Sequence, residues 1–171
     1  MSLNAAGREI PDEVDGRKLK PFRSAYAALE SGFFAPQPKK PCAWGESKLL
    51  PTIDSVFERA KLGDGSCLSF HHHLRNGDRV LNAVMSVAEK RGLKNLKLAQ
   101  SAIFPVHEPV CRLIENGTIT SIEGSTNGPV GRMISEGKMR GLAVMRSHGA
   151  RVRAIMAGDI KIDAAFIAAP C

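Results

Sequence analysis

The feature that most constrains the fold is a regular alternation of apolar runs and helical patterns between Thr52 and Ala168. Short apolar runs predict strands, and apolar residues spaced at i, i+3, i+4 and i+7 predict amphipathic helices. The predicted strands are 66–70, 95–99, 118–123, 142–146 and 162–168, and the predicted helices are 53–60, 78–91, 109–116, 130–135 and 151–157. This alternation predicts an α/β fold, with a mostly parallel sheet and helices on both faces.

Helix boundaries are marked by caps and glycines. Thr52 stands where it can cap the first helix, and Gly92, Gly117 and Gly158 follow helices where a left-handed residue would end them. In the second helix, the spacing predicts a buried face carried by four residues, namely Leu81, Val84, Met85 and Ala88.

Residues 1–51 differ in composition from the rest of the chain. They hold six prolines, Pro11, Pro21, Pro36, Pro38, Pro41 and Pro51. Such a segment predicts a proline-rich N-terminal arm with little regular structure, which wraps a surface or reaches a partner, or else a loose extension. Trp44 is its predicted anchor. The predicted organisation is an arm over 1–51 and an α/β domain over 52–171.

Composition limits the classes of function. With 171 residues, 43% hydrophobic and 24% charged, the chain is long enough for one ordinary globular domain. Aromatic residues make up only 5%, which disfavours a binder that stacks single-stranded bases. The net charge of +7 is spread along the chain, so a solvated surface with one anionic-ligand site is favoured over a nucleic-acid partner.

Compartment signals point to the cytoplasm. No apolar run approaches the roughly 18 residues of a transmembrane helix, and the charged N-terminus does not resemble a signal peptide. We therefore predict no membrane partner. Four widely spaced cysteines, Cys42, Cys67, Cys111 and Cys171, predict reduced thiols and no disulfide or zinc framework.

Polar and glycine residues follow each predicted strand, where ligands bind in open α/β sheets. The sets are 71–77, 101–108, 125–129 and 147–151, and we expect them to face one crevice. Glu108 and Glu123 are the acidic candidates there, and neither has an evident partner that would tune it as a base. The dinucleotide fingerprint and the P-loop are both absent.

The most conspicuous of these sets begins with His71, His72 and His73. Neighbours on an extended segment point to opposite faces, so the three cannot easily bind one ion, and we predict no metal site. One or two of these imidazoles are expected to donate hydrogen bonds to a ligand, while loop histidines without a role stay an alternative. Arg75, Asn76 and Gly77 form a predicted anion site, with Asp78 as a helix cap, although Asn-Gly can also be a simple turn.

The ordered motifs SFHHHLRNGD, KNLKLAQSAIFPVHEPV, NGPVGRMIS, RSHGARVRAI and IKIDAAFIAAPC resemble the citrate lyase alpha chain family, from Leu49 onward. This family is related to the coenzyme A transferases. The resemblance implies a coenzyme A transferase (NagB/RpiA-like) fold of two α/β domains. It also implies an acyl transferase activity, in which citrate replaces acetyl on an acyl carrier thioester and acetate leaves.

The resemblance implies partners and cofactors too. These are the beta chain, the acyl carrier (gamma) chain, citrate and acetate, with homo-oligomer contacts. The carrier's phosphoribosyl-dephospho-CoA group, or a CoA thioester, would be a substrate, no cofactor would be bound covalently, and Mg²⁺ would serve only the lyase step of the complex.

Related chains are longer, so the resemblance implies that the second domain is absent here and that this fragment alone is inactive. The main catalytic glutamate is expected outside these residues. Ten residues are assigned to substrate or carrier binding, namely His71, His72, His73, Arg75, Gly77, Ser125, Asn127, Ser147, His148 and Gly149. The alternatives are a citramalate-type lyase subunit, a sugar-phosphate isomerase-like enzyme, and an assembly module of a multi-subunit complex.

Overall fold

The structure is a computed structural model of the whole chain, and it describes residues 1–4, 7–19, 45, 47–72, 74 and 76–168. The chain forms two compact units, residues 1–33 and residues 34–171, and each is described by itself. Trp44, the predicted anchor of the arm, lies outside the described residues.

The first unit contains two short antiparallel hairpins. β1 (Ser2–Leu3) pairs with β2 (Glu9–Ile10), and β3 (Glu13–Val14) pairs with β4 (Arg17–Lys18). Among the described residues of 1–19, regular structure is therefore limited to these four strands of two residues each. Strands of two residues are too short to show the apolar alternation on which a sequence prediction depends.

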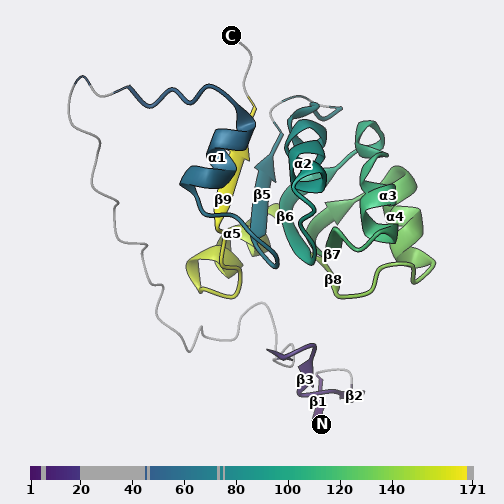
Figure 1. Cartoon of the computed structure of the whole chain (residues 1–171). Coiled ribbons are helices and arrows are strands. Elements are labelled where there is room, and N and C mark those ends of the chain that lie inside the picture. Colours follow the sequence, from purple (N-terminus) through teal and green to yellow (C-terminus); the bar gives the residue numbers. More distant parts are fainter. Residues whose placement is uncertain (5–6, 20–44, 46, 73, 75, 169–171) are drawn as a thin grey trace. The chain divides into compact units, whose positions relative to one another are not determined.

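The second unit is built on five parallel strands in the order β8-β7-β6-β5-β9 (Figure 1). The strands are β5 (Cys67–His71), β6 (Leu96–Ile103), β7 (Ile119–Thr126), β8 (Ala143–Met145) and β9 (Ala164–Ile167). The last strand of the chain returns to pair with the first strand of this sheet, with His71 opposite Ile167. The predicted parallel α/β architecture is confirmed.

The first two helices begin and end as their sequences predict. α1 (Ile53–Arg59) is capped by the Thr52 hydroxyl, which accepts a hydrogen bond from the Ser55 N–H at 3.1 Å. α2 (Val80–Lys90) buries its predicted face completely, and Gly92 follows it at a φ of +70°. Asp78 caps α2 as predicted, because its Oδ1 accepts from the Val80 N–H at 2.8 Å.

The remaining helical segments are η1 (Pro105–His107), α3 (Val110–Glu115), α4 (Gly128–Ser135) and α5 (His148–Met156). α5 starts three residues before the predicted start at Arg151. The Ser147 hydroxyl accepts from the Ala150 N–H at 3.2 Å, so Ser147 is a helix cap and His148 and Gly149 form the first turn. The sequence pattern predicted a polar turn at these residues, because a glycine normally indicates a break in a helix.

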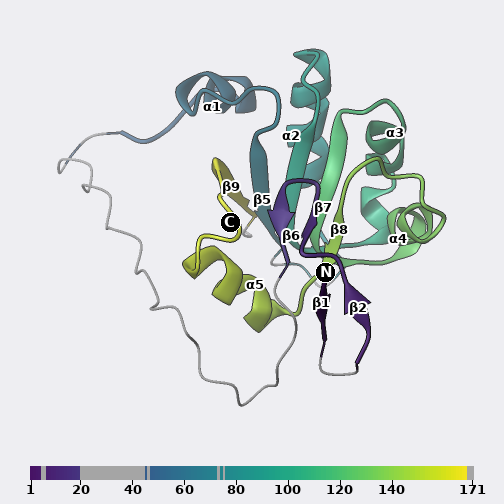
Figure 2. The same ribbon diagram turned by 90° about the horizontal axis from the view of Figure 1, so that it is seen from below.

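The two faces of the sheet are covered unequally. One core cluster joins buried residues of α1, α2, α3 and α4 to one face of the sheet. A smaller cluster on the other face contains Cys67, Ala99, Ala154 and Ile160, which places α5 there (Figure 2). Phe70 and Phe166 stack on the larger side with ring centroids 5.3 Å apart, and they join β5 to β9.

β6 and β7 both run further than predicted, and their extra residues form the polar end of the sheet. Gly124 lets the two strands approach there, since a Cβ on this residue would lie 2.0 Å from the Gln100 carbonyl oxygen. The extension escapes prediction because Gln100, Ser101 and Ser125 interrupt the apolar runs. Among the described residues, no helix has the length and apolar character needed to cross a membrane.

Candidate functional site

The loop after β5 places one histidine in a buried polar cluster. The His72 Nδ1 atom lies 2.8 Å from the Asp78 Oδ2 atom, and the two side chains are only 3% and 8% exposed. Asp78 uses its other oxygen to cap α2, so the same carboxylate anchors both the histidine and the helix. Burial opposes ionisation of Asp78, but hydrogen bonds from His72 and Val80 outweigh it and lower the pKa of the carboxyl.

His107, which belongs to the predicted strand-end set 101–108 but not to the ten assigned binding residues, completes this cluster from the loop after β6. Its Nδ1 accepts from the Phe104 N–H at 3.0 Å, so the ring proton must be on Nε2, which donates to the Asp78 carbonyl oxygen at 2.8 Å. The His72 and His107 rings stack with centroids 4.5 Å apart. His107 is completely buried, and this burial lowers its pKa, so the neutral ring is the stable form.

The other predicted residues of this loop are placed differently. His71 is exposed at the end of β5, while His73 and Arg75 lie outside the described residues. Gly77 has a φ of +81°, and a Cβ there would lie 2.9 Å from the Phe104 ring, so this glycine is required by packing against the next loop. Of the three adjacent histidines, His72 is therefore buried against Asp78 and His71 is exposed, while His73 lies outside the described residues.

A second group of predicted residues lies after β7 and β8. Ser125 and Asn127 are exposed where β7 leads into α4, and Ser147, His148 and Gly149 are exposed where β8 leads into α5. α4 and α5 cover opposite faces of the sheet. The strand order reverses between β5 and β9, because the chain runs from β5 through β6 and β7 to β8 and then returns to β9. This reversal is the topological switch point, where open α/β sheets bind ligands, and the loop after β5 lies beside it.

The structure thus gathers the described site residues into two groups at the carboxyl ends of the strands. The β5 group and the β7–β8 group are separated by β6, which lies between β5 and β7 in the sheet. Glu123, for which the sequence shows no evident partner that would tune it as a base, pairs with an arginine. Its Oε2 lies 2.8 Å from the Arg146 Nε, and the carboxylate is 8% exposed. Glu108 is exposed at the end of η1.

Two buried side chains near the β5 and β6 ends carry polar atoms that lack hydrogen-bond partners within the described part of the chain. The His72 Nε2 atom is one, and both amide atoms of the wholly buried Gln100 are the others. Buried polar groups are nearly always paired, so these mark a polar interior where the strands end. A glutamine inside the apolar run KLAQSAI is the sequence signal that could have indicated it.

Metal and thiol chemistry have little support among the described residues. No group of three or more potential metal ligands is present among them. Cys67 and Cys111 are free thiols, as expected for reduced cysteines, while Cys42 and Cys171 lie outside the described residues. Burial, and secondarily the nearby carboxylates of Asp163 and Glu123, raise the pKa of Cys67 to about 11. Its thiol is therefore protonated at neutral pH and is no nucleophile there.

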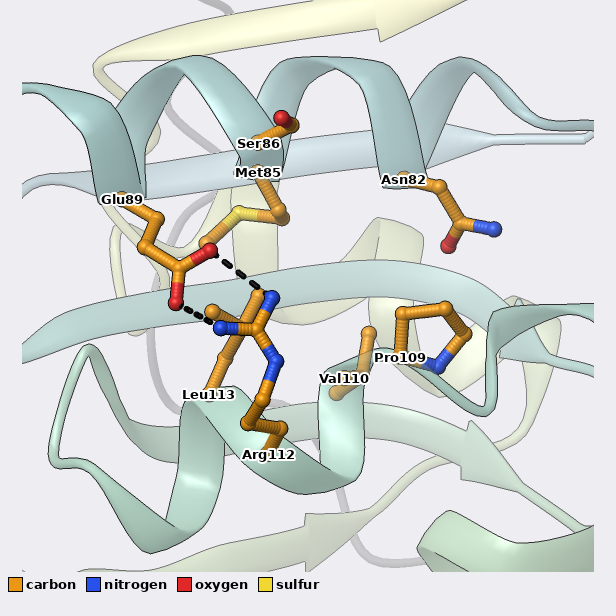
Figure 3. Close-up of a pocket in the computed structure, with 8 residues that line it drawn as sticks. All are labelled: Asn82, Met85, Ser86, Glu89, Pro109, Val110, Arg112 and Leu113. Carbon is orange, nitrogen blue, oxygen red and sulfur yellow. Dashed lines mark hydrogen bonds and ion pairs between the residues drawn. The ribbon is translucent and has the colours of Figure 1, made fainter.

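A shallow pocket of 240 Å³ lies between α2 and α3, away from the strand ends (Figure 3). The Arg112 guanidinium donates to the Glu89 carboxylate across it, with one contact of 2.8 Å, and the Asn82 amide donates to the Val106 carbonyl at 2.9 Å. None of the predicted site residues lines this pocket. We therefore place the candidate site at the strand ends.

The fold and the strand-end groups define an open parallel α/β domain whose polar residues collect at the carboxyl ends of its strands. Comparison with known proteins is more specific, because the chain matches the family described as Citrate lyase, alpha subunit (CitF) over residues 46–171. The chain belongs to this family, as its motifs predicted.

Relatives of known name agree with this assignment. The citrate lyase alpha chain of Haemophilus influenzae is 39% identical over 127 residues, covering 74% of this chain and 25% of the relative. That of Escherichia coli is 38% identical over 126 residues, covering 73% and 25%. A crystal structure of the citrate lyase alpha subunit from Streptococcus mutans, in complex with citrate, superposes with a TM-score of 0.83 at 40% identity. The superposition covers 98% of the present chain and 32% of the Streptococcus mutans chain. The present chain therefore spans about a quarter to a third of the length of these relatives.

Proposed function

We propose that this chain supplies the first α/β domain of a citrate lyase acyl transferase. In the proposed reaction, citrate and an acetyl thioester of the acyl carrier give acetate and the citryl thioester. The thioester sulfur loses the acetyl group and gains the citryl group, while one citrate carboxylate oxygen leaves with the acetyl group as acetate. Atoms and charge balance, and no redox partner is required.

The observation that carries this proposal is the match over residues 46–171 to the alpha subunit family. Two further facts support it. A relative of the same fold and 40% identity has been solved with citrate bound. The β7 and β8 ends carry hydroxyl, amide and imidazole groups, which suit the carboxylates of citrate and the oxygen of a thioester.

The proposed roles follow from where the side chains lie. Ser125, Asn127 and His148 would contact the acid or the carrier group at the carboxyl ends of β7 and β8, beside Ser147 and Gly149. His71, with His73 and Arg75, would form the wall after β5, which the His72–Asp78–His107 cluster and Gly77 hold in place. The catalytic glutamate, the beta chain, the acyl carrier chain and the Mg²⁺ of the lyase step all belong to the rest of the proposed complex.

A chimaera tests this function. Residues 46–171 would replace the matched segment of the Escherichia coli citrate lyase alpha chain, and the assembled complex would be assayed for citrate-dependent acetate release from acetyl-CoA. We expect release by the chimaera and none by the present chain alone. A chimaera that assembles with normal mass but exchanges no acetyl group would contradict the proposal.

The acid is tested in the same assay. Citramalate replaces citrate as the acceptor, with the unmodified Escherichia coli complex as the matched control. We expect the chimaera to prefer citrate. A chimaera that prefers citramalate would assign this segment to the citramalate-type enzymes, and it would also place the determinants of the acid within residues 46–171.

A further inference from the structure

The sheet face that α5 covers carries a half-buried arginine in an unusual setting. Arg151 extends from α5 across β5 and β6. Its Nη2 donates to the Ser69 hydroxyl oxygen at 2.6 Å and to the Ala99 carbonyl oxygen at 3.1 Å. Ser69 is only 4% exposed and Ala99 only 1%, so both acceptors belong to the rigid sheet. The guanidinium is therefore held in a fixed position by two uncharged groups.

Arg151 has no carboxylate partner within the part of the chain that the structure describes. Its Nε is buried without a hydrogen bond, and both hydrogen bonds of the guanidinium among these residues come from Nη2. Burial lowers the pKa of Arg151, although a guanidinium stays protonated at physiological pH. A fixed, partly desolvated charge without a counter-ion is costly, and arginines in such positions are normally paired.

Two carboxylates near this part of the sheet are already engaged. Glu123 lies on the same face, in register with Ala99, and its carboxylate is paired with Arg146 at 2.8 Å. The Asp163 carboxylate accepts from the Cys67 N–H at 2.7 Å. Lys97, which is exposed on the same face, adds positive charge. Arg146 and Lys97 are therefore two further cations near Arg151 in the described part of the chain, while the carboxylates of Glu123 and Asp163 are committed to other groups.

We propose that Arg151, with the Ser69 hydroxyl beside it, is an oxyanion-binding site that takes one carboxylate or phosphate group. The Ser69 oxygen accepts from Arg151, so its own hydrogen stays available to donate to the anion. The Nη1 hydrogens supply the charge-assisted bonds. The site does not depend on the acyl transferase function, and either a carboxylic acid or a phosphorylated molecule can supply the anion.

Nitrogen-15 NMR of the whole 171-residue chain tests this site directly, because each arginine Nε–H gives its own signal. The chain would be titrated with sodium citrate or sodium phosphate at constant ionic strength, with glycerol as the uncharged control. We expect a saturable shift of the Arg151 Nε–H signal with at least one anion and none with glycerol. The anion that saturates at the lower concentration identifies the class of ligand.

Variants separate binding from packing. Arg151→Lys keeps the charge and most of the stem but loses the planar fork, and we expect it to weaken anion binding about tenfold. Arg153→Gln is the matched control, since Arg153 is exposed on the same helix. This variant should bind the anion as tightly as the wild type does. Arg151→Gln should abolish the site, and its circular dichroism shows whether the domain still folds.

The proposal fails if neither anion shifts the Arg151 signal in the folded wild type. It also fails if Arg151→Lys binds as tightly as the wild type, or if Arg153→Gln weakens binding equally, because the effect would then be general electrostatics. If Arg151→Gln does not fold, the wild-type titration and Arg151→Lys still decide the matter.

Discussion

At the residue scale, His107 joins two strand-end loops that are distant in sequence. It accepts from Phe104 in its own loop and donates to Asp78, 29 residues earlier, at the start of α2. Both bonds require the neutral ring, because a protonated Nδ1 could not accept from the Phe104 N–H. The imidazole is therefore a pH-sensitive link in the wall of the candidate site.

We predict that the domain loses stability as the pH falls below about 6.5. The folded state lowers the pKa of His107 from its ordinary value of 6.5, so the unfolded chain binds more protons in this range. The contribution of His107 to the free energy of unfolding is complete above pH 6.5 and is lost as the pH falls. His107→Gln, which keeps one donor and one acceptor, should flatten this dependence.

Thermal unfolding measured between about pH 5 and 8 checks the prediction, with the exposed His148→Gln as the control. If His107→Gln keeps the wild-type slope, His107 is not the titrating group. At lower pH a second loss is expected from Asp78, whose depressed pKa gives a contribution that is present above 3.8 and lost as the pH falls further.

At the scale of single elements, two glycines illustrate opposite constraints. Gly124 in β7 has a φ of +145°, and any side chain there would collide with the backbone of β6. Gly149 lies in the first turn of α5, and the position that an alanine Cβ would take there has nothing within 4 Å. The close approach of β6 and β7 therefore requires a glycine at position 124, whereas the fold does not require one at position 149.

We predict that Gly124→Ala destabilises the domain by about 3 kcal/mol or more, because two backbones must separate. Gly149→Ala should stabilise it by about 0.5–1 kcal/mol, because alanine loses less entropy in a helix. Urea denaturation of both variants measures the free energies of unfolding. Equal effects of the two substitutions would contradict this account of the sheet.

Sequence patterns predicted the helices and strands better than the site. The buried face of α2, the Thr52 cap and the glycine stops follow local rules that a single sequence displays. The start of α5 was misplaced because Gly149 suggested a turn where the Ser147 cap starts a helix. The contacts of His72 with Asp78 and His107, and of Arg151 with Ser69, join residues whose proximity depends on the sheet order, which no local pattern encodes.

At the scale of the whole molecule, we predict that residues 52–171 fold without the first 51. The sheet and both core clusters lie within these residues. A truncated chain should therefore show a cooperative thermal transition close to that of the whole chain. A transition lowered by more than about 8 °C, roughly 2 kcal/mol for a domain of this size, would assign residues 1–51 a part in the core.

Cys67 offers a reporter of global unfolding. It is 8% exposed, and burial raises its pKa to about 11, so alkylation at about pH 8 should require the sheet to open. Cys111, which is only partly buried, should react faster in the native protein. Mass spectrometry of iodoacetamide-treated protein, with and without urea, measures both rates. Rapid native labelling of Cys67 would show that the α5 face opens locally.

The pairing of β9 with β5 has a consequence for how the chain is made. The Cys67 N–H donates to Asp163 across 96 residues, and β5 pairs with β9 just beyond this point. On the ribosome, β5 can pair with β6 early, but its other edge stays open until residues 164–167 have emerged. Closure of the sheet is thus a late, high-contact-order step. Until then, the nascent domain presents an unpaired strand edge to any neighbouring chain.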